Sequence, residues 1–122
     1  EIANQMPIYV AERALALVKG SKTSPKVLIM GVAYKPGVGD VRETPASALR
    51  AALVARGAEV AWIDPLVPLW EGTNPVSEAW DCDVAIVATN QPGLDVKSLL
   101  ARGIPVLDCT NNYGEQAGVE LL

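Results

Sequence analysis

Short hydrophobic runs alternate along the chain with longer segments in which hydrophobic residues recur at helical spacing. The runs have the length of buried strands and are bounded by glycine, proline and polar residues. They predict strands at 26–30, 59–63, 84–88 and 105–107. The longer segments predict helices at 5–19, 45–56 and 96–101. The segment 66–76 has no clear period, 77–80 is predicted as a short helical turn, and the chain beyond Asn111 is left unassigned.

Residues that favour helix ends support these helices. Asn4, Thr44 and Asp95 are each of a type that caps a helix N-terminus. Proline is tolerated in a first helical turn, where its missing N–H is not needed, and Pro7 and Pro45 are predicted to lie in such turns.

The alternation of strands and helices predicts a doubly wound α/β fold, with a mostly parallel sheet and helices on both faces. Ligands of such sheets bind beyond the carboxyl ends of the strands. The loops that start at Gly31, Asp64, Thr89 and Asp108 follow the four predicted strands. They are therefore expected at the functional edge of the sheet.

Composition narrows the possible chemistry. The 122 residues suit one domain, and half of them are hydrophobic. Histidine is absent and only two cysteines occur, so this chain alone supplies no histidine base, zinc site or disulfide framework. The net charge of −4 disfavours a nucleic-acid or anionic membrane surface, and the hydrophobic runs are too short for a membrane span. We expect a cytoplasmic protein without a signal peptide or a metal.

The segment 20–25 has the small, polar composition of a linker. It predicts a boundary that separates residues 1–24, a helix of a neighbouring domain with its linker, from a domain over residues 25–122.

The loop from Gly31 to Thr44 is the strongest candidate for a site. It leads into a predicted helix N-terminus, which favours an anion, and it carries Lys35, Arg42 and three glycines. It matches neither the dinucleotide fingerprint nor the phosphate-binding P-loop. The residues alone leave open a solvated surface loop in which Arg42 pairs with Asp40 or Glu43.

The same loop resembles the start of the C-terminal, UDP-binding domain of the UDP-glucose/GDP-mannose dehydrogenase family. That pattern runs G-x-A-[FY]-K-x-x-x-x-D-x-R-E-[ST], and each of its fixed positions is present here. The resemblance continues through Gly57-Ala58-Glu59-Val60, Asp64-Pro65 and the strand after Cys82, and covers about residues 25–112. The segment Met6-Pro7-Ile8-Tyr9-Val10 is similar to the M-P-x-Y-V of a late helix in the family's central dimerisation domain.

The resemblance implies a function and a role for single residues. The family oxidises the C6 alcohol of a nucleotide sugar to a carboxylate, with two NAD and a catalytic cysteine. It implies that this chain is the last part of such an enzyme, that Tyr34 and Lys35 contact the UDP-sugar, and that Arg42 reaches NAD, which an N-terminal domain mainly binds. No catalytic residue is predicted here, because neither cysteine lies in the family's G-G-x-C context. The resemblance also implies a homodimer, and the UDP-N-acetylhexosamine branch fits better than the UDP-glucose branch.

Several residues have two interpretations. Asp64 is read as a turn residue rather than a ribose-binding acid, and Asp40 as a turn cap rather than a partner that orients Arg42. Cys82, Cys109 and the three tryptophans are predicted to be structural, whereas Tyr9 and Arg13 could face a partner subunit.

One departure from the family favours an alternative function. Where many members have D-x-R-N after the last strand, this chain has Asp108-Cys109-Thr110-Asn111 and so lacks a substrate-binding arginine. The alternative is a non-catalytic nucleotide-binding or protein-interaction module of the same fold.

Overall fold

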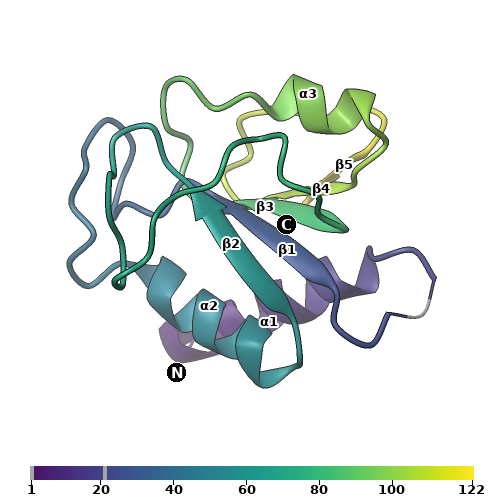
Figure 1. Cartoon of the computed structure of the whole chain (residues 1–122), viewed down its shortest axis with the longest axis horizontal. Coiled ribbons are helices and arrows are strands. Elements are labelled where there is room, and N and C mark those ends of the chain that lie inside the picture. The colour runs from purple at the N-terminus through teal and green to yellow at the C-terminus, as the bar shows by residue number, and fades with distance from the viewer. Residues whose placement is uncertain (1, 21) are drawn as a thin grey trace.

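Five parallel strands form a single sheet in the computed structural model, which describes residues 2–20 and 22–122. Their order across the sheet is β2-β1-β3-β4-β5, so the chain first moves to one side of β1 and then to the other (Figure 1). The strands are β1 (Lys26–Met30), β2 (Glu59–Ile63), β3 (Val84–Val87), β4 (Val106–Asp108) and β5 (Val119–Leu121). The predicted doubly wound α/β class is confirmed.

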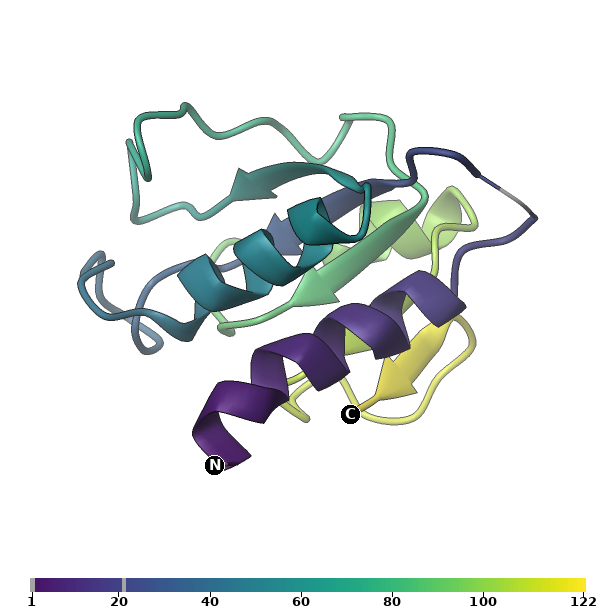
Figure 2. The ribbon, with the colours of Figure 1, turned by 90° about the horizontal axis from the view of Figure 1, so that it is seen from below.

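Helices cover both faces of the sheet. Helices α1 (Ile2–Ala16) and α2 (Pro45–Ala55) lie on one face, and α3 (Val96–Ala101) lies on the other (Figures 1 and 2). Side chains alternate across a strand, so β1 contributes Val27 and Ile29 to the core beneath α1 and α2, and Leu28 and Met30 to the core beneath α3. Burial on both faces explains why the inner strands read as continuous hydrophobic runs.

Helix α2 begins as predicted. The Thr44 hydroxyl accepts a hydrogen bond from the amide of Ala46 at 3.3 Å and donates one to the carbonyl of Val32 at 2.8 Å. Pro45 follows at the first helical position, where its fixed φ suits a helix. The N-cap therefore also attaches the start of α2 to the end of β1.

The predicted bounds of the first helix are wrong at both ends. Helix α1 begins at Ile2, so Asn4 lies inside it and Pro7 is in its interior rather than in its first turn. A cap preference does not by itself place a helix start, because asparagine is only mildly unfavourable within a helix. At the other end α1 stops at Ala16 rather than Lys19, since tighter turns carry Leu17 and Val18.

The chain beyond Asn111, which the sequence left unassigned, contains β5. This strand is an edge strand of three residues with a polar centre, Glu120. Arg13 of α1 donates hydrogen bonds to the Glu120 carboxylate at 3.0 Å and to the carbonyl of Leu121 at 2.9 Å. Arg13 is thus engaged within this chain, and the interpretation that Tyr9 and Arg13 face a partner subunit stays a prediction.

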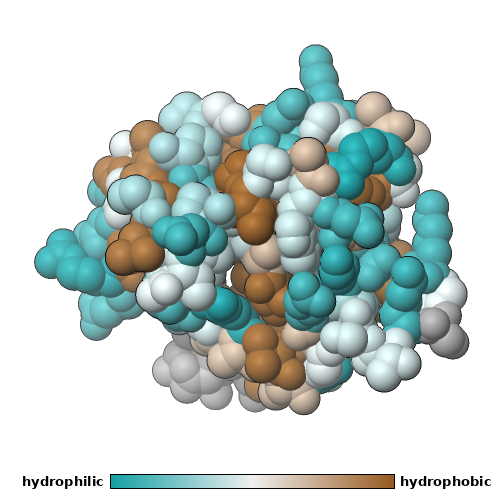
Figure 3. Space-filling view, viewed as in Figure 1, coloured by the Kyte–Doolittle hydropathy of each residue, from teal (hydrophilic) through white to brown (hydrophobic). Residues whose placement is uncertain are grey.

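The connection from β2 to β3 contains no helix. Trp62 and Trp70 are buried in edge-to-face contact at 5.7 Å, and the Trp62 indole donates a hydrogen bond to Thr73 at 2.9 Å. Trp80 packs against the core on the other face, beside Lys26. The prediction that the tryptophans are structural is confirmed. Residues 77–80 form one turn, closed by a hydrogen bond from the Trp80 amide to the Ser77 carbonyl, and are not part of a helix. In Figure 3, hydrophobic residues form a band down the middle of the face where β2 lies, and further hydrophobic patches lie toward the left of the view.

The predicted linker contacts the rest of the chain. Ser24 donates a hydrogen bond to the carbonyl of Gly57 at 3.0 Å, and Lys22 pairs with Asp83 at 3.2 Å, while Ser21 lies outside the described residues. The boundary between residues 24 and 25 stays a prediction.

Candidate functional site

The site lies where the chain reverses its direction across the sheet. Strands β1 and β3 are neighbours, but the loops that follow them run to opposite sides, which is where ligands bind in this strand order. At Gly31, φ is +81°, and an added Cβ would lie 1.9 Å from the Thr89 carbonyl oxygen. Glycine therefore allows the two loops to touch directly after their strands.

Asp64, at the end of β2, holds the beginning of the β1–α2 loop. One carboxylate oxygen accepts hydrogen bonds from the amides of Val32 at 2.9 Å and Ala33 at 3.1 Å, and the other accepts one from Leu66 at 2.9 Å. Asp64 is buried, with 3% of its surface exposed. The interpretation of Asp64 as a turn residue is confirmed, because its carboxylate is used inside the protein.

Gln91, in the loop after β3, holds the middle of the same β1–α2 loop. Its side-chain oxygen accepts a hydrogen bond from Gly37 at 2.8 Å, and its side-chain nitrogen donates to the carbonyl of Val38 at 2.8 Å and to Asp64 at 3.1 Å. Thr89 adds a hydrogen bond from its hydroxyl to the carbonyl of Ala33 at 2.8 Å. The loop after β3 thus supports the loop after β1.

Tyr34 and Lys35 project from the supported loop. Tyr34 is 58% exposed although its amide is bonded to the carbonyl of Asp40 at 2.7 Å. Lys35 is exposed and has no ion-pair partner among the residues that the structure describes. Both predicted substrate-binding side chains are therefore accessible on a backbone that is held in place.

Arg42 lies on the same side of the loop but is paired. Its guanidinium donates two hydrogen bonds to the Asp40 carboxylate, at 3.0 and 2.9 Å, and its amide donates a third at 3.0 Å. These bonds from Arg42 lower the pKa of Asp40 to about 2. Asp40 therefore performs both roles that the sequence left open, because it caps a turn and also orients Arg42.

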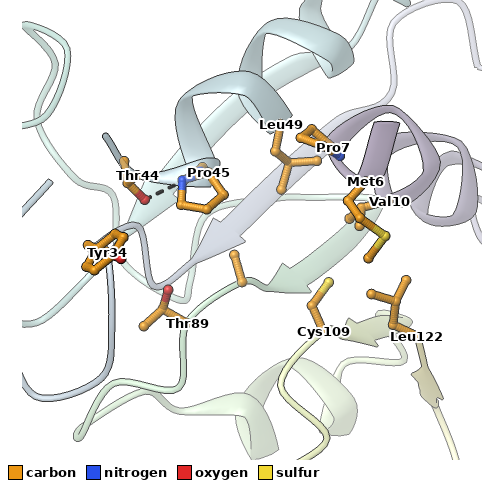
Figure 4. Close-up of a pocket in the computed structure, with 12 residues that line it drawn as sticks. Met6, Pro7, Val10, Tyr34, Thr44, Pro45, Leu49, Thr89, Cys109 and Leu122 are labelled. Carbon is orange, nitrogen blue, oxygen red and sulfur yellow. Dashed lines mark hydrogen bonds between the residues drawn. The ribbon is translucent and has the colours of Figure 1, made fainter. Parts of the chain in front are cut away.

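An apolar pocket of about 350 Å³ opens beside this loop (Figure 4). It lies between α1, the N-terminus of α2 and the carboxyl ends of the strands. Tyr34 and Thr44 stand at one end, and Met6, Cys109 and Leu122 stand at the other. The first helix, not assigned to the site by the sequence, supplies part of the wall.

Tyr34 also borders a second, open cavity of about 530 Å³, which Asp40, Arg42 and Glu43 line. Tyr34 thus borders both an apolar pocket and a polar cavity. The lining of this cavity carries one cation, Arg42, and two carboxylates, Asp40 and Glu43. For a ligand with a flat apolar part and an anionic part, further positive charge would have to come from Lys35, next to Tyr34 in the chain, and from the α2 N-terminus.

The turn after β4 borders the site at the end opposite Tyr34. Asp108 is buried, and its carboxylate accepts hydrogen bonds from the Thr110 hydroxyl at 2.6 Å and from the amides of Thr110 at 2.8 Å and Tyr113 at 3.0 Å. Burial raises the pKa of Asp108, but the hydrogen bonds from Thr110, Tyr113 and Asn112 outweigh it, so the pKa lies below 3.8. Thr110, which replaces the family's arginine, therefore uses its hydroxyl inside the turn.

Neither cysteine has the environment of a nucleophile. Burial raises the pKa of Cys82 to about 11 and that of Cys109 to about 12, so both are neutral thiols at physiological pH. Their predicted structural role agrees with this. Within residues 2–20 and 22–122, no group of acidic or cysteine side chains could hold a metal, and no helix is long and apolar enough to cross a membrane.

The structure brings Tyr34 and Arg42 to one cavity, with Lys35 next to Tyr34 in the chain, whereas Asp64 faces inward beneath them. Sequence reasoning located the loop after β3 but missed Gln91 in it. A signal was present, because Gln91 follows Thr89 and Asn90 and precedes a Pro-Gly turn at the functional edge of the sheet.

Comparison with known proteins places the chain in a family. The profile of the UDP-glucose/GDP-mannose dehydrogenase family, UDP binding domain, matches residues 28–115. The chain belongs to this family. The match contains the end of β1, the whole β1–α2 loop and β2 to β4, so the loops of the candidate site lie within this UDP binding domain, whereas α1 and Leu122 in the pocket wall lie outside the matched residues.

Its relatives are nucleotide-sugar dehydrogenases. The chain is 34% identical over 95 residues to the UDP-N-acetyl-D-mannosamine dehydrogenase of Methanococcus maripaludis, with 74% of this chain and 22% of that protein covered. It is 39% identical over 64 residues to the enzyme of the same name from Methanocaldococcus jannaschii, with 52% of this chain and 14% of that protein covered.

Solved structures share the fold. The UDP-D-ManNAc dehydrogenase from Pyrococcus horikoshii superposes with a TM-score of 0.74 at 21% identity, over 96% of this chain and 30% of that one. The chain thus spans less than a third of the length of each of these three proteins.

Proposed function

We propose that this chain is the substrate-binding part of an NAD-dependent nucleotide-sugar dehydrogenase, which oxidises the C6 alcohol of a UDP-sugar to a carboxylate. The observation that carries the proposal is the position of Tyr34, which borders both the apolar pocket and the polar cavity at the reversal point of a UDP binding domain. A nucleoside diphosphate has the matching shape, with a flat base next to a diphosphate.

Each predicted site residue has a role in this proposal. Tyr34 lines the ligand pocket, and Lys35, whose ammonium is exposed and unpaired with any described carboxylate, binds the diphosphate as a cation. Arg42 contacts NAD, since its side chain is 87% exposed and its guanidinium is already oriented by Asp40. When bound, NAD would accept the hydride from C6. The chain has no dinucleotide fingerprint, so Arg42 would add one contact to a cofactor held mainly elsewhere.

The substrate class and setting belong to the same proposal. Relatives named UDP-N-acetyl-D-mannosamine dehydrogenase favour a UDP-N-acetylhexosamine over UDP-glucose. A cytoplasmic location agrees with two free thiols, Cys82 and Cys109. The homodimer is proposed from the family resemblance alone.

Calorimetric titration of the 122-residue chain with UDP tests the proposal. Lys35→Ala should weaken binding about tenfold, because a charged hydrogen-bond donor is lost. Lys97→Ala is the matched control, since Lys97 is an exposed lysine on α3, on the other face of the sheet. Arg42→Ala should change UDP affinity less than Lys35→Ala. Absence of UDP binding by the unmodified chain, or equal effects of the two lysine variants, would contradict the proposal.

A panel of UDP-sugars tests the substrate class. UDP-N-acetylmannosamine or UDP-N-acetylglucosamine should bind more tightly than UDP-glucose, and the reverse order would overturn that choice.

Thr110 favours the second candidate, a binding module without a role in catalysis. Its hydroxyl is bonded to Asp108, so it does not replace the cation that family members place here. Restoring that cation with Thr110→Arg separates a UDP site from a protein-interaction module. A UDP-sugar site should gain affinity for UDP, whereas a module that binds another ligand should not.

A further inference from the structure

We infer that Gln91 is a positioning residue that holds the segment between Ala33 and Gly37 in the shape that binds a diphosphate. The inference rests on the proposed function, because it names the residue that prepares Tyr34 and Lys35 for their ligand. Gln91 itself is 2% exposed and borders neither cavity at the site.

The orientation of the buried amide is determined by its partners. The oxygen must face the Gly37 amide, which only donates, and the nitrogen must face the Val38 carbonyl, which only accepts. The second hydrogen of the nitrogen is donated to Asp64. Reversing the amide would leave two backbone groups opposite atoms of the wrong kind.

Gln91 and Asp64 together hold both ends of the exposed segment. Asp64 accepts hydrogen bonds from Val32 and Ala33, directly before Tyr34, and Gln91 bonds Gly37 and Val38, directly after Pro36. The contact between Gln91 and Asp64 joins these two attachments at 3.1 Å. The backbone between them can therefore keep one conformation while its side chains remain exposed.

The attachment after Pro36 depends on Gln91. In the part of the chain that the structure describes, no other side chain bonds the backbone of Gly37 or Val38. Gly37 has a φ of +81°, and a Cβ added to it would meet nothing within 4 Å, so no neighbouring group packs on that side of it. Without Gln91, Gly37 and Val38 would be held only by the turn that the Tyr34 amide closes with the Asp40 carbonyl, so this half of the segment would be more mobile, and ordering it would cost free energy when the ligand binds.

Two variants and one control test this role in the 122-residue chain. Gln91→Met keeps the side-chain length and removes all three hydrogen bonds. Gln91→Asn keeps an amide that is one methylene too short to reach Gly37 and Asp64 together. Thr73→Val is the control, because it removes two hydrogen bonds near Trp62 and Trp70 at a distance from the loop.

Two measurements apply to every variant that is folded by circular dichroism. UDP affinity by calorimetry should fall about tenfold in either Gln91 variant, since two or more hydrogen bonds order the segment, and less than twofold in Thr73→Val. Hydrogen exchange of the Gly37 amide should accelerate about tenfold in the Gln91 variants relative to the control.

The outcomes separate this inference from the proposed function. If the unmodified chain binds UDP and a folded Gln91 variant binds it equally well, the positioning role is wrong while the UDP site stands. If both Gln91 and Thr73 variants lose affinity in proportion to their melting temperature, Gln91 contributes only to stability. If the unmodified chain binds no UDP, the proposed function fails, and unchanged Gly37 exchange in the variants would also remove the structural role of Gln91.

Discussion

At the scale of single residues, one carboxylate can cap a turn and bind a cation at the same time. Asp40 accepts a hydrogen bond from the Arg42 amide and two from its guanidinium, so the alternatives left by the sequence are both realised. The pair is at the surface, where water screens ion pairs and leaves them little net contribution to stability. Its consequence is therefore local, in the orientation of Arg42.

The titration of Asp40 gives a direct test of this pair. The pKa of Asp40 should be about 2 in the unmodified chain and should return toward 3.8 in Arg42→Ala, because the variant removes the guanidinium that stabilises the carboxylate. Side-chain carbonyl chemical shifts followed against pH by NMR measure it. Arg50→Ala, which breaks the pair with Glu71 instead, should leave the Asp40 titration unchanged. An Asp40 pKa near 3.8 in the unmodified chain would show that the pair does not form in solution.

The ionisation of Asp108 makes the stability of the molecule depend on pH. Its folded-state pKa lies below its ordinary value of 3.8, so its stabilising contribution is present above that pH and is lost as the pH falls toward the folded-state pKa. Asp40 and Asp83, whose pKa values are also lowered, add to the same loss.

The free energy of unfolding should therefore decrease as the pH falls from about 5 to about 2, and it should decrease less in Asp108→Asn. Asparagine keeps one oxygen acceptor for the turn but does not titrate. Urea denaturation at a series of pH values measures both curves. Parallel curves for the two proteins would show that Asp108 makes no contribution to the pH dependence.

At the scale of elements, the reversal between β1 and β3 depends on a close approach of two loops. Gly31 allows it, because any side chain there would meet the carbonyl of Thr89. The same contact brings Gln91 beneath the β1–α2 loop. The end of β1 and the loop after β3 are therefore best regarded as one structural unit that carries the exposed residues.

Gly31 and Gly37 have the same φ, so the effect of a close approach on stability can be measured separately from the effect of the backbone conformation. Both Gly31 and Gly37 have φ of +81°, but an added Cβ at Gly37 meets nothing within 4 Å. Gly37→Ala should cost about 1–2 kcal/mol of unfolding free energy, from the left-handed conformation alone. Gly31→Ala should cost more than about 4 kcal/mol or prevent folding, because the carbonyl of Thr89 must also move. Chemical denaturation compares them, and equal losses would contradict the close approach.

Elements with a strong local signal could be predicted from the sequence. The buried strands β1 and β3 are continuous hydrophobic runs, and α2 has Thr44 and Pro45 at its start. By contrast, β5 is a strand because β4 and Arg13 hold it, and neither contact is visible in the local pattern around Glu120.

Some residues of the candidate site could likewise be predicted from the sequence, and others could not. Tyr34, Lys35 and Arg42 could be predicted because they lie in one continuous motif. Gln91 could not be assigned a role, since its partners lie 53 and 54 positions away in the chain and become neighbours only when β1 and β3 pair. Likewise, the sequence could not place Met6 and Pro7 in the wall of the pocket, because that requires α1 to pack on the sheet face with its N-terminal turns near the carboxyl ends of the strands.

At the scale of the whole molecule, α1 packs as part of the same layered unit as the sheet. Val10, Ala11 and Ala14 are buried in the core with α2, and Arg13 bonds β5. A boundary between residues 24 and 25 predicts that residues 25–122 fold independently. Removing α1 would, however, expose the face of β3 and β4 that it covers, and would open the apolar pocket on one side.

The chain of residues 25–122 should therefore be less stable than the whole chain, by about 3 kcal/mol or more, because the buried face of α1 and the surface beneath it become exposed to water. Urea denaturation of the two chains measures the difference.

A matched pair of substitutions tests the same contact without truncation, since Val10 is 7% exposed in α1 and Val54 is 55% exposed in α2. Val10→Ala should destabilise the chain and Val54→Ala should not, because only the first leaves a cavity. Equal stability of the two chains, together with equal effects of the two substitutions, would instead support the boundary and make α1 an appendage of the sheet.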